Sequence, residues 1–134
     1  MVTLLLVLRL LTIGTVTALL ALMLHVGEPA RLDWWLGAIP FAFWIIGPAV
    51  TAYVCARNYA DRLWFTYVMM AYLVLSAAVS AVSYYQAFFV STRSTSALIM
   101  VVMPFFQWMA LACVGLISAG VAVSLDRRSI ATDA

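Results

Sequence analysis

Pro104 and Gln107 stand about one helical turn apart in the apolar stretch VVMPFFQWMA, at residues 101–110. A proline inside a helix removes one backbone donor, and a glutamine carries an amide that hydrocarbon does not solvate. The carbonyl of Met100, four residues before the proline, therefore needs a neighbour's hydroxyl or amide, or a water. We expect Gln107 to point into packed protein, so the pair predicts that other helices pack against this segment.

Small and polar residues elsewhere in the apolar stretches repeat at the spacing of one helical turn. Pairs of small residues four positions apart let helix backbones approach closely. Such pairs are Gly14 and Ala18, Ser76 and Ser80, and Gly115 and Ala119. The residues predicted to form a helix-packing or partner seam are Gly14, Thr15, Ser76, Ser80, Pro104, Gln107 and Gly115. Two interpretations of the polar members stay open: hydrogen bonds between helices, or a seam that lines a pore or receives a partner helix.

Groups for catalysis or metal binding are sparse and scattered. The carboxylates all fall in predicted connections or the tail: Glu28, Asp33, Asp61, Asp126 and Asp133. Proton-coupled carriers commonly place a carboxylate within the membrane, so this placement argues against such a carrier. His25 is the only histidine, and Cys55 and Cys113 are isolated, so one chain lacks the clusters that bind metals or haem. We expect no enzyme activity, no cofactor and no metal, although a cofactor shared with other chains stays open.

The composition places these residues in a membrane protein. Apolar residues make up 67% of the 134 residues and charged residues only 9%, against about half and about a quarter in globular proteins. The formal net charge of +2 comes from scattered arginines, which predicts no nucleic-acid partner. A helix needs about 20 apolar residues to cross a bilayer, and the chain has room for four. We predict one membrane domain over residues 1–134.

The spans follow from the apolar runs and the breakers between them. Four spans are predicted at about residues 4–24, 34–56, 63–89 and 97–125, with a short polar tail at 126–134. Asp33 is a candidate N-cap of the second span, and Ser94, Thr95 and Ser96 are candidates for the fourth. Prolines at 40, 48 and 104 predict kinks in the second and fourth helices.

Short connections and the distribution of arginine predict the topology. Every connection has fewer than a dozen residues, so neighbouring helices should be antiparallel, in an all-α, up-down four-helix bundle. Arg57, Arg62, Arg127 and Arg128 fall on one side of the membrane, against Arg31 and Arg93 on the other. Because cytoplasmic loops are enriched in arginine, we expect both termini to be cytoplasmic.

The stretches WWLGAIPFAFWIIGP and STSALIMVVMPFFQW, within four short spans, give the chain a resemblance to small bacterial inner-membrane proteins. Some proteins of this layout are immunity proteins, which sit in the membrane and neutralise a secreted toxin. The resemblance implies a location in the inner membrane and a protein partner. It covers the layout of the chain and carries over no catalytic or binding residue.

These observations favour a non-enzymatic protein that associates with another integral membrane protein, or with itself, within the lipid bilayer. The partner is either a larger complex, to which the chain is an accessory subunit, or a toxin that it restrains. The alternative is a homo-oligomeric channel or small-molecule transporter, with the polar seam as its path. A third possibility is an enzyme or cofactor-binding subunit whose site other chains complete.

Overall fold

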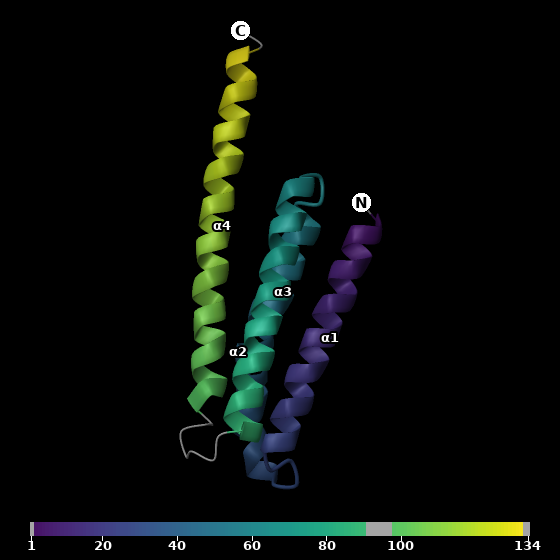
Figure 1. Cartoon of the computed structure of the whole chain (residues 1–134), viewed down its shortest axis with the longest axis vertical. Coiled ribbons are helices and arrows are strands. Elements are labelled where there is room, and N and C mark those ends of the chain that lie inside the picture. Colours follow the sequence, from purple (N-terminus) through teal and green to yellow (C-terminus); the bar gives the residue numbers. More distant parts are fainter. Residues whose placement is uncertain (1, 91–97, 133–134) are drawn as a thin grey trace.

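A computed structural model describes the backbone of residues 2–90 and 98–132. The chain forms α1 (Val2–Val26), α2 (Leu32–Asn58), α3 (Leu63–Tyr85) and α4 (Ile99–Thr132), and α3 continues into a π-helical segment, η1 (Gln86–Val90). Successive helices run up and down, so the first residues of α1 and the last of α4 lie at the same end (Figure 1).

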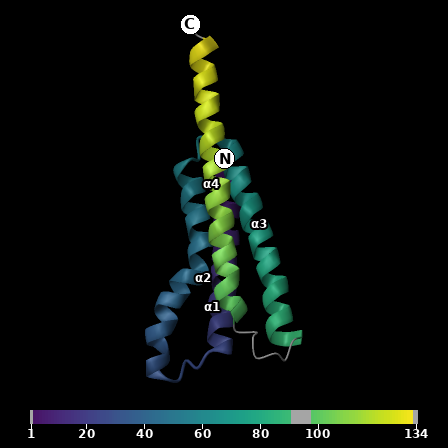
Figure 2. The same cartoon turned by 90° about the vertical axis from the view of Figure 1, so that its left-hand side faces the viewer.

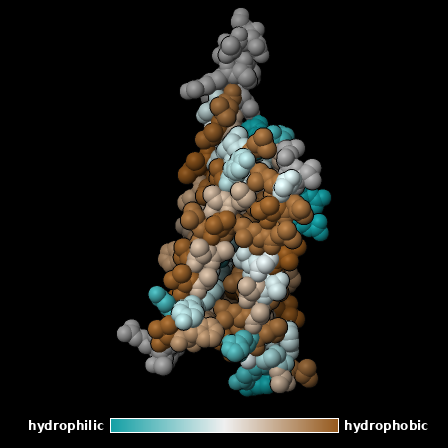
Figure 3. Space-filling model, turned by 45° about the vertical axis from the view of Figure 1, so that its right-hand side comes forward, coloured by the Kyte–Doolittle hydropathy of each residue, from teal (hydrophilic) through white to brown (hydrophobic). Residues whose placement is uncertain are grey.

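Each helix carries a stretch that is long and apolar enough to cross a membrane. These stretches are Thr3–Val26, Leu32–Asn58, Leu63–Val90 and Ile99–Leu125. Large apolar side chains cover much of the outer surface, which is predominantly hydrophobic along the spans (Figure 3). A soluble monomer rarely exposes so large an apolar surface, so the fold supports the all-α, multi-pass membrane protein expected from the sequence. The segment expected as a tail is helical through Thr132 and extends α4 beyond the other helices (Figure 1).

The helices are arranged with α2 and α3 as the central elements. α1 packs against α2 and α3 on one side of the bundle, and α4 packs against the same two helices on the other. Figure 2 shows this arrangement, with α4 in front, α1 behind it, and α2 and α3 to the two sides. The outer helices α1 and α4 therefore each keep a wide face that none of the other described helices covers.

The core consists of two apolar clusters stacked along the bundle. One cluster is made of Leu8, Ala49, Ala52, Ala56, Phe65, Met69, Tyr72, Leu73 and Leu111. The other is made of Leu19, Met23, Ala38, Ile45, Tyr84 and Met100. The buried alanines at 49, 52 and 56 lie three and four residues apart on one face of α2, where small side chains permit close helix packing. Our sequence analysis did not single out these alanines, although their helical spacing is the same signal that drew attention to Gly14 and Gly115.

The connection between α1 and α2 corrects the predicted cap at Asp33. The N-cap of α2 is Arg31, without a capping side-chain hydrogen bond, and Asp33 lies in the first turn of the helix. Its carboxylate instead accepts hydrogen bonds from the Arg31 guanidinium, at 2.6 and 3.2 Å, and Glu28 accepts another at 3.2 Å. These bonds to Asp33 and Glu28 raise the pKa of Arg31 above its usual value. The candidate caps Ser94, Thr95 and Ser96 lie outside the described residues.

Candidate functional site

Gln107 forms the polar centre of the bundle. Its side-chain Nε2 donates a hydrogen bond to the Ser80 hydroxyl at 2.6 Å. Gln107 is 9% exposed and Ser80 is 4% exposed, so the bond joins α4 to α3 within the protein. Along α3 and α4, the two residues stand between the members of the two apolar clusters. The prediction that Gln107 points into packed protein is confirmed.

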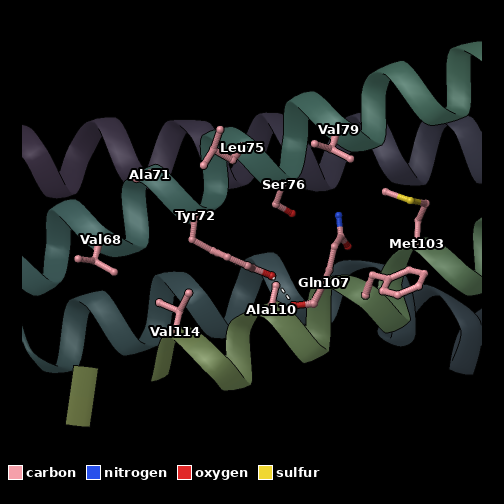
Figure 4. Close-up of a pocket in the computed structure, with 11 residues that line it drawn as sticks. Val68, Ala71, Tyr72, Leu75, Ser76, Val79, Met103, Gln107, Ala110 and Val114 are labelled. Atoms are coloured by element: carbon pink, nitrogen blue, oxygen red, sulfur yellow. Dashed lines mark hydrogen bonds between the residues drawn. The ribbon is translucent and has the colours of Figure 1, made fainter. Parts of the chain in front are cut away.

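Tyr72 adds a second bond between the same two helices. The Tyr72 hydroxyl donates to the backbone carbonyl of Gln107 at 2.9 Å (Figure 4). Ser80 is eight residues beyond Tyr72 on α3, so two polar groups about two turns apart hold one residue of α4. Our sequence analysis did not identify Tyr72. Tyr72 is four residues before Ser76 and eight before Ser80, and this helical spacing indicates that all three lie on one face of α3.

Pro104 is buried where α4 faces α2. Because the proline removes the helical donor to the Met100 carbonyl, we expected a side chain to supply one. Among the described residues, the side-chain bond goes to the next carbonyl: the indole Nε1 of Trp44 donates to Val101 at 3.4 Å. The expected donor to Met100 itself does not occur among the side-chain hydrogen bonds of these residues.

The two glycines of the predicted seam lie away from this polar centre. A Cβ built on Gly14 of α1 or on Gly115 of α4 meets no atom within 4 Å. By contrast, a Cβ on Gly47 of α2 would lie 2.5 Å from Cζ2 of Trp108. Within one chain, therefore, Gly47 makes the close helix contact that small residues permit, and the two seam glycines do not.

The remaining members of the seam have intermediate positions. Ser76 is half-buried on α3, where it faces the groove beside Gln107, and Thr15 is half-buried on α1. The structure brings Ser76, Ser80 and Gln107 together at the α3/α4 contact, whereas Pro104 is buried one turn away on α4. Thr15 lines a second groove, between α1 and α3, and Ser80 lines this groove as well.

Two apolar grooves open on the surface of the bundle. The α3/α4 groove has a volume of about 530 Å³ and contains Tyr72, Ser76 and Gln107 among apolar residues (Figure 4). The α1/α3 groove has a volume of about 630 Å³, and Gly14, Thr15, Ala18 and Ser80 contribute to its lining. Both grooves consist of segments that are long and apolar enough to cross a membrane, and they present concave apolar surfaces with few polar groups.

Groups for metal or nucleophilic chemistry do not converge at these grooves. No three His, Cys, Asp or Glu side chains come together as potential metal ligands among the described residues. His25 is exposed and stacks on Phe89 with 6.3 Å between ring centroids. Cys55 is half-buried and Cys113 is exposed, and neither thiol is in a disulfide.

Comparison of the chain with models of protein families, with characterised proteins and with solved structures finds no match.

Proposed function

We propose that the chain is a non-enzymatic integral membrane protein that acts by helix–helix association with another membrane protein. In this proposal it is an accessory subunit of a larger complex or an immunity-type inhibitor of a secreted toxin. It resides in a bacterial inner membrane with both termini in the cytoplasm. Kinks at Pro40, Pro48 and Pro104 shape the second and fourth helices.

The main support for this proposal is the free space around Gly14 and Gly115. Each glycine pairs with an alanine four residues later, and such pairs form contacts in which helix backbones come close together. Space is free within 4 Å of a Cβ at either position. A side chain from another protein's helix has room beside Gly14 or Gly115 without displacing an atom that contacts either glycine.

The use of the central polar groups within the bundle favours surface binding over transport. Gln107 Nε2 and Ser80 bond to each other, and the Tyr72 hydroxyl bonds to the Gln107 carbonyl. The Thr12 hydroxyl donates to the Leu8 carbonyl of its own helix at 2.9 Å. A channel or carrier needs a continuous polar path for its solute, and groups that bond one another provide only isolated points.

Purification in mild detergent followed by mass spectrometry tests the proposal. We expect a specific larger membrane protein to co-purify with the wild type. Gly115→Leu and Gly14→Leu should abolish this association by holding the helices apart, while helix content and thermal unfolding stay as in the wild type. Cys113→Leu, at an exposed position on the side of α4 away from Gly115, is the matched control and should retain the partner.

Reconstitution in liposomes tests the alternative directly. We expect the purified protein to be electrically and osmotically silent. Saturable flux from the protein alone would overturn the proposal in favour of a homo-oligomeric channel or transporter, with Thr15, Ser80 and Gln107 as the first residues to test along its path.

A further inference from the structure

The α3/α4 groove contains a hydrogen-bond acceptor to which none of the described residues donates. Gln107 is nine-tenths buried, and its carboxamide lies against the groove with Ser76 and Met103 beside it (Figure 4). The nitrogen of this carboxamide donates to Ser80. The oxygen accepts no hydrogen bond from the described residues. An amide oxygen in hydrocarbon without a donor is costly, and lipid tails bring none, so the groove favours an occupant with a donor deep in the membrane.

The outer face of α1 offers a donor of this kind. Gly14, Thr17, Ala18 and Ala21 are all exposed and share one side of the helix, where Gly14 and Ala18 also line the edge of the α1/α3 groove. The Thr17 hydroxyl makes no hydrogen bond to the described residues, whereas Thr12, on the inner side, bonds to its own helix. The outer face thus combines a free hydroxyl with side chains small enough to bring a backbone close.

The donor and the acceptor lie at matching depths. Val26, at the end of α1, and Ile99, at the start of α4, are at the same end of the bundle (Figure 1). At a rise of 1.5 Å per residue, Thr17 is about 14 Å from Val26, and Gln107 is about 12 Å from Ile99. Two copies inserted in the same orientation therefore place Thr17 of one and Gln107 of the other at nearly the same level.

We infer that the α3/α4 groove binds α1 of a second copy of this chain, with the Thr17 hydroxyl donating to the side-chain oxygen of Gln107. The partner copy supplies the donor that the groove lacks, and Gly14, Ala18 and Ala21 let its helix enter. Since the groove and the α1 face are different surfaces, the contact is head-to-tail and continues into a ring or a longer array. This inference goes beyond the proposed function, because it names a second copy of the chain as a further partner and gives the site that this copy occupies.

Disulfide cross-linking between two differently tagged copies tests the contact. Both copies carry Cys55→Ser and Cys113→Ser. One carries Thr17→Cys, and the other carries Ala110→Cys in the groove, and the two are co-expressed in membranes. We expect oxidation to give a product that contains both tags. Ala112→Cys, two residues further along α4 and outside the groove, is the matched control and should give none.

The strength of self-association in detergent measures how much the same contact contributes to binding between two copies. Ala110→Trp fills the groove and should abolish self-association, while Ala112→Trp should leave it unchanged. Thr17→Val keeps the shape of the side chain and removes the donor, and the loss of one such bond corresponds to about a threefold weaker association. Helix content and thermal unfolding of each variant show whether it is folded. Gln107 itself is left intact here because it also holds Ser80.

Three outcomes would overturn the inference. If the wild-type protein stays monomeric at every protein-to-detergent ratio, no second copy binds and lipid alone fills the groove. Cross-linking of Thr17→Cys to Thr17→Cys, without the mixed product, places α1 against α1. Equal cross-linking of Ala110→Cys and Ala112→Cys means that the contact is random. If any of these occurs while a larger protein still co-purifies in a Gly115-dependent way, the proposed function stands and only this inference falls.

Discussion

At the scale of single residues, Gln107 determines how α4 is held. Its side-chain Nε2 donates to Ser80 and its carbonyl accepts from Tyr72, so one residue of α4 makes two bonds to α3. Apolar packing between membrane helices gains little from exclusion of water, because lipid tails are also apolar. Directional bonds between buried polar groups therefore help to fix the rotation of α4 against α3.

Replacement of Gln107 by leucine should destabilise the protein. Gln107→Leu removes the bond to Ser80, and a bond of this kind contributes on the order of 1 kcal/mol in membrane proteins. We expect a lower midpoint of thermal unfolding in detergent. Ser80→Ala should lower the midpoint as well, and the double variant should be destabilised by less than the sum of the two, since both single variants lose the same bond. A Gln107→Leu protein as stable as the wild type would mean that the bond contributes nothing.

At the scale of elements, the contact between α2 and α4 depends on a small residue beside a large ring. The Trp108 indole lies against Gly47, and Trp44 lies near Trp108 with 6.5 Å between ring centroids. Pro48, next to Gly47, is among the most deeply buried residues of the chain. The two proline-containing helices thus meet at Gly47 through an aromatic wedge, and not at the glycines of the predicted seam.

Enlargement of Gly47 should therefore disturb the bundle, whereas enlargement of Gly115 should not. In Gly47→Leu the new side chain must displace the Trp108 ring, and overpacking of this kind costs about 1–3 kcal/mol. We expect a lower unfolding midpoint and a change in tryptophan fluorescence. Gly115→Leu, which has free space around it, is the control and should unfold like the wild type. Equal stability of both variants would contradict the close contact at Gly47.

At the scale of the whole molecule, the two ends of the bundle differ in charge. The α2–α3 connection lies at the same end of the bundle as the end of α4, which projects beyond it (Figure 1). In the sequence this end carries Arg57 at the end of α2, Arg62 in the connection, and Arg127 and Arg128 in α4. At the opposite end, Arg31 forms ion pairs with Glu28 and Asp33. The end with more arginines is therefore expected to face the cytoplasm.

Cysteine labelling in intact cells tests this orientation. In a background with Cys55→Ser and Cys113→Ser, a membrane-impermeant thiol reagent should label Ala30→Cys, in the exposed α1–α2 connection. It should leave Asp61→Cys, in the exposed α2–α3 connection, unlabelled until the membrane is opened. The reverse pattern would invert the topology and place both termini outside the cytoplasm.

The number and type of the helices could be predicted from the sequence because both depend on local properties. A run of about 20 apolar residues forms a membrane helix whatever its neighbours are, since hydrocarbon leaves the backbone no other partner for its hydrogen bonds. Glycine and proline at the end of the first run, and the charged stretch ARNYADR after the second, separate the runs. The burial of Gln107 also followed from the sequence, because an amide in hydrocarbon needs a hydrogen-bond partner and only other protein segments supply one.

Only the tertiary structure decided which face of each helix turns inward. In a soluble protein the polar face marks the outside, but here apolar side chains surround every helix, and both lipid and core accept them. A small residue is equally compatible with either environment, which is why the sequence suggested close helix contacts at Gly14 and Gly115, whereas both have open space around them in the fold. The buried positions of Gly47, Ala52 and Tyr72 depend on how four helices rotate against one another, and that rotation is a property of their packing together.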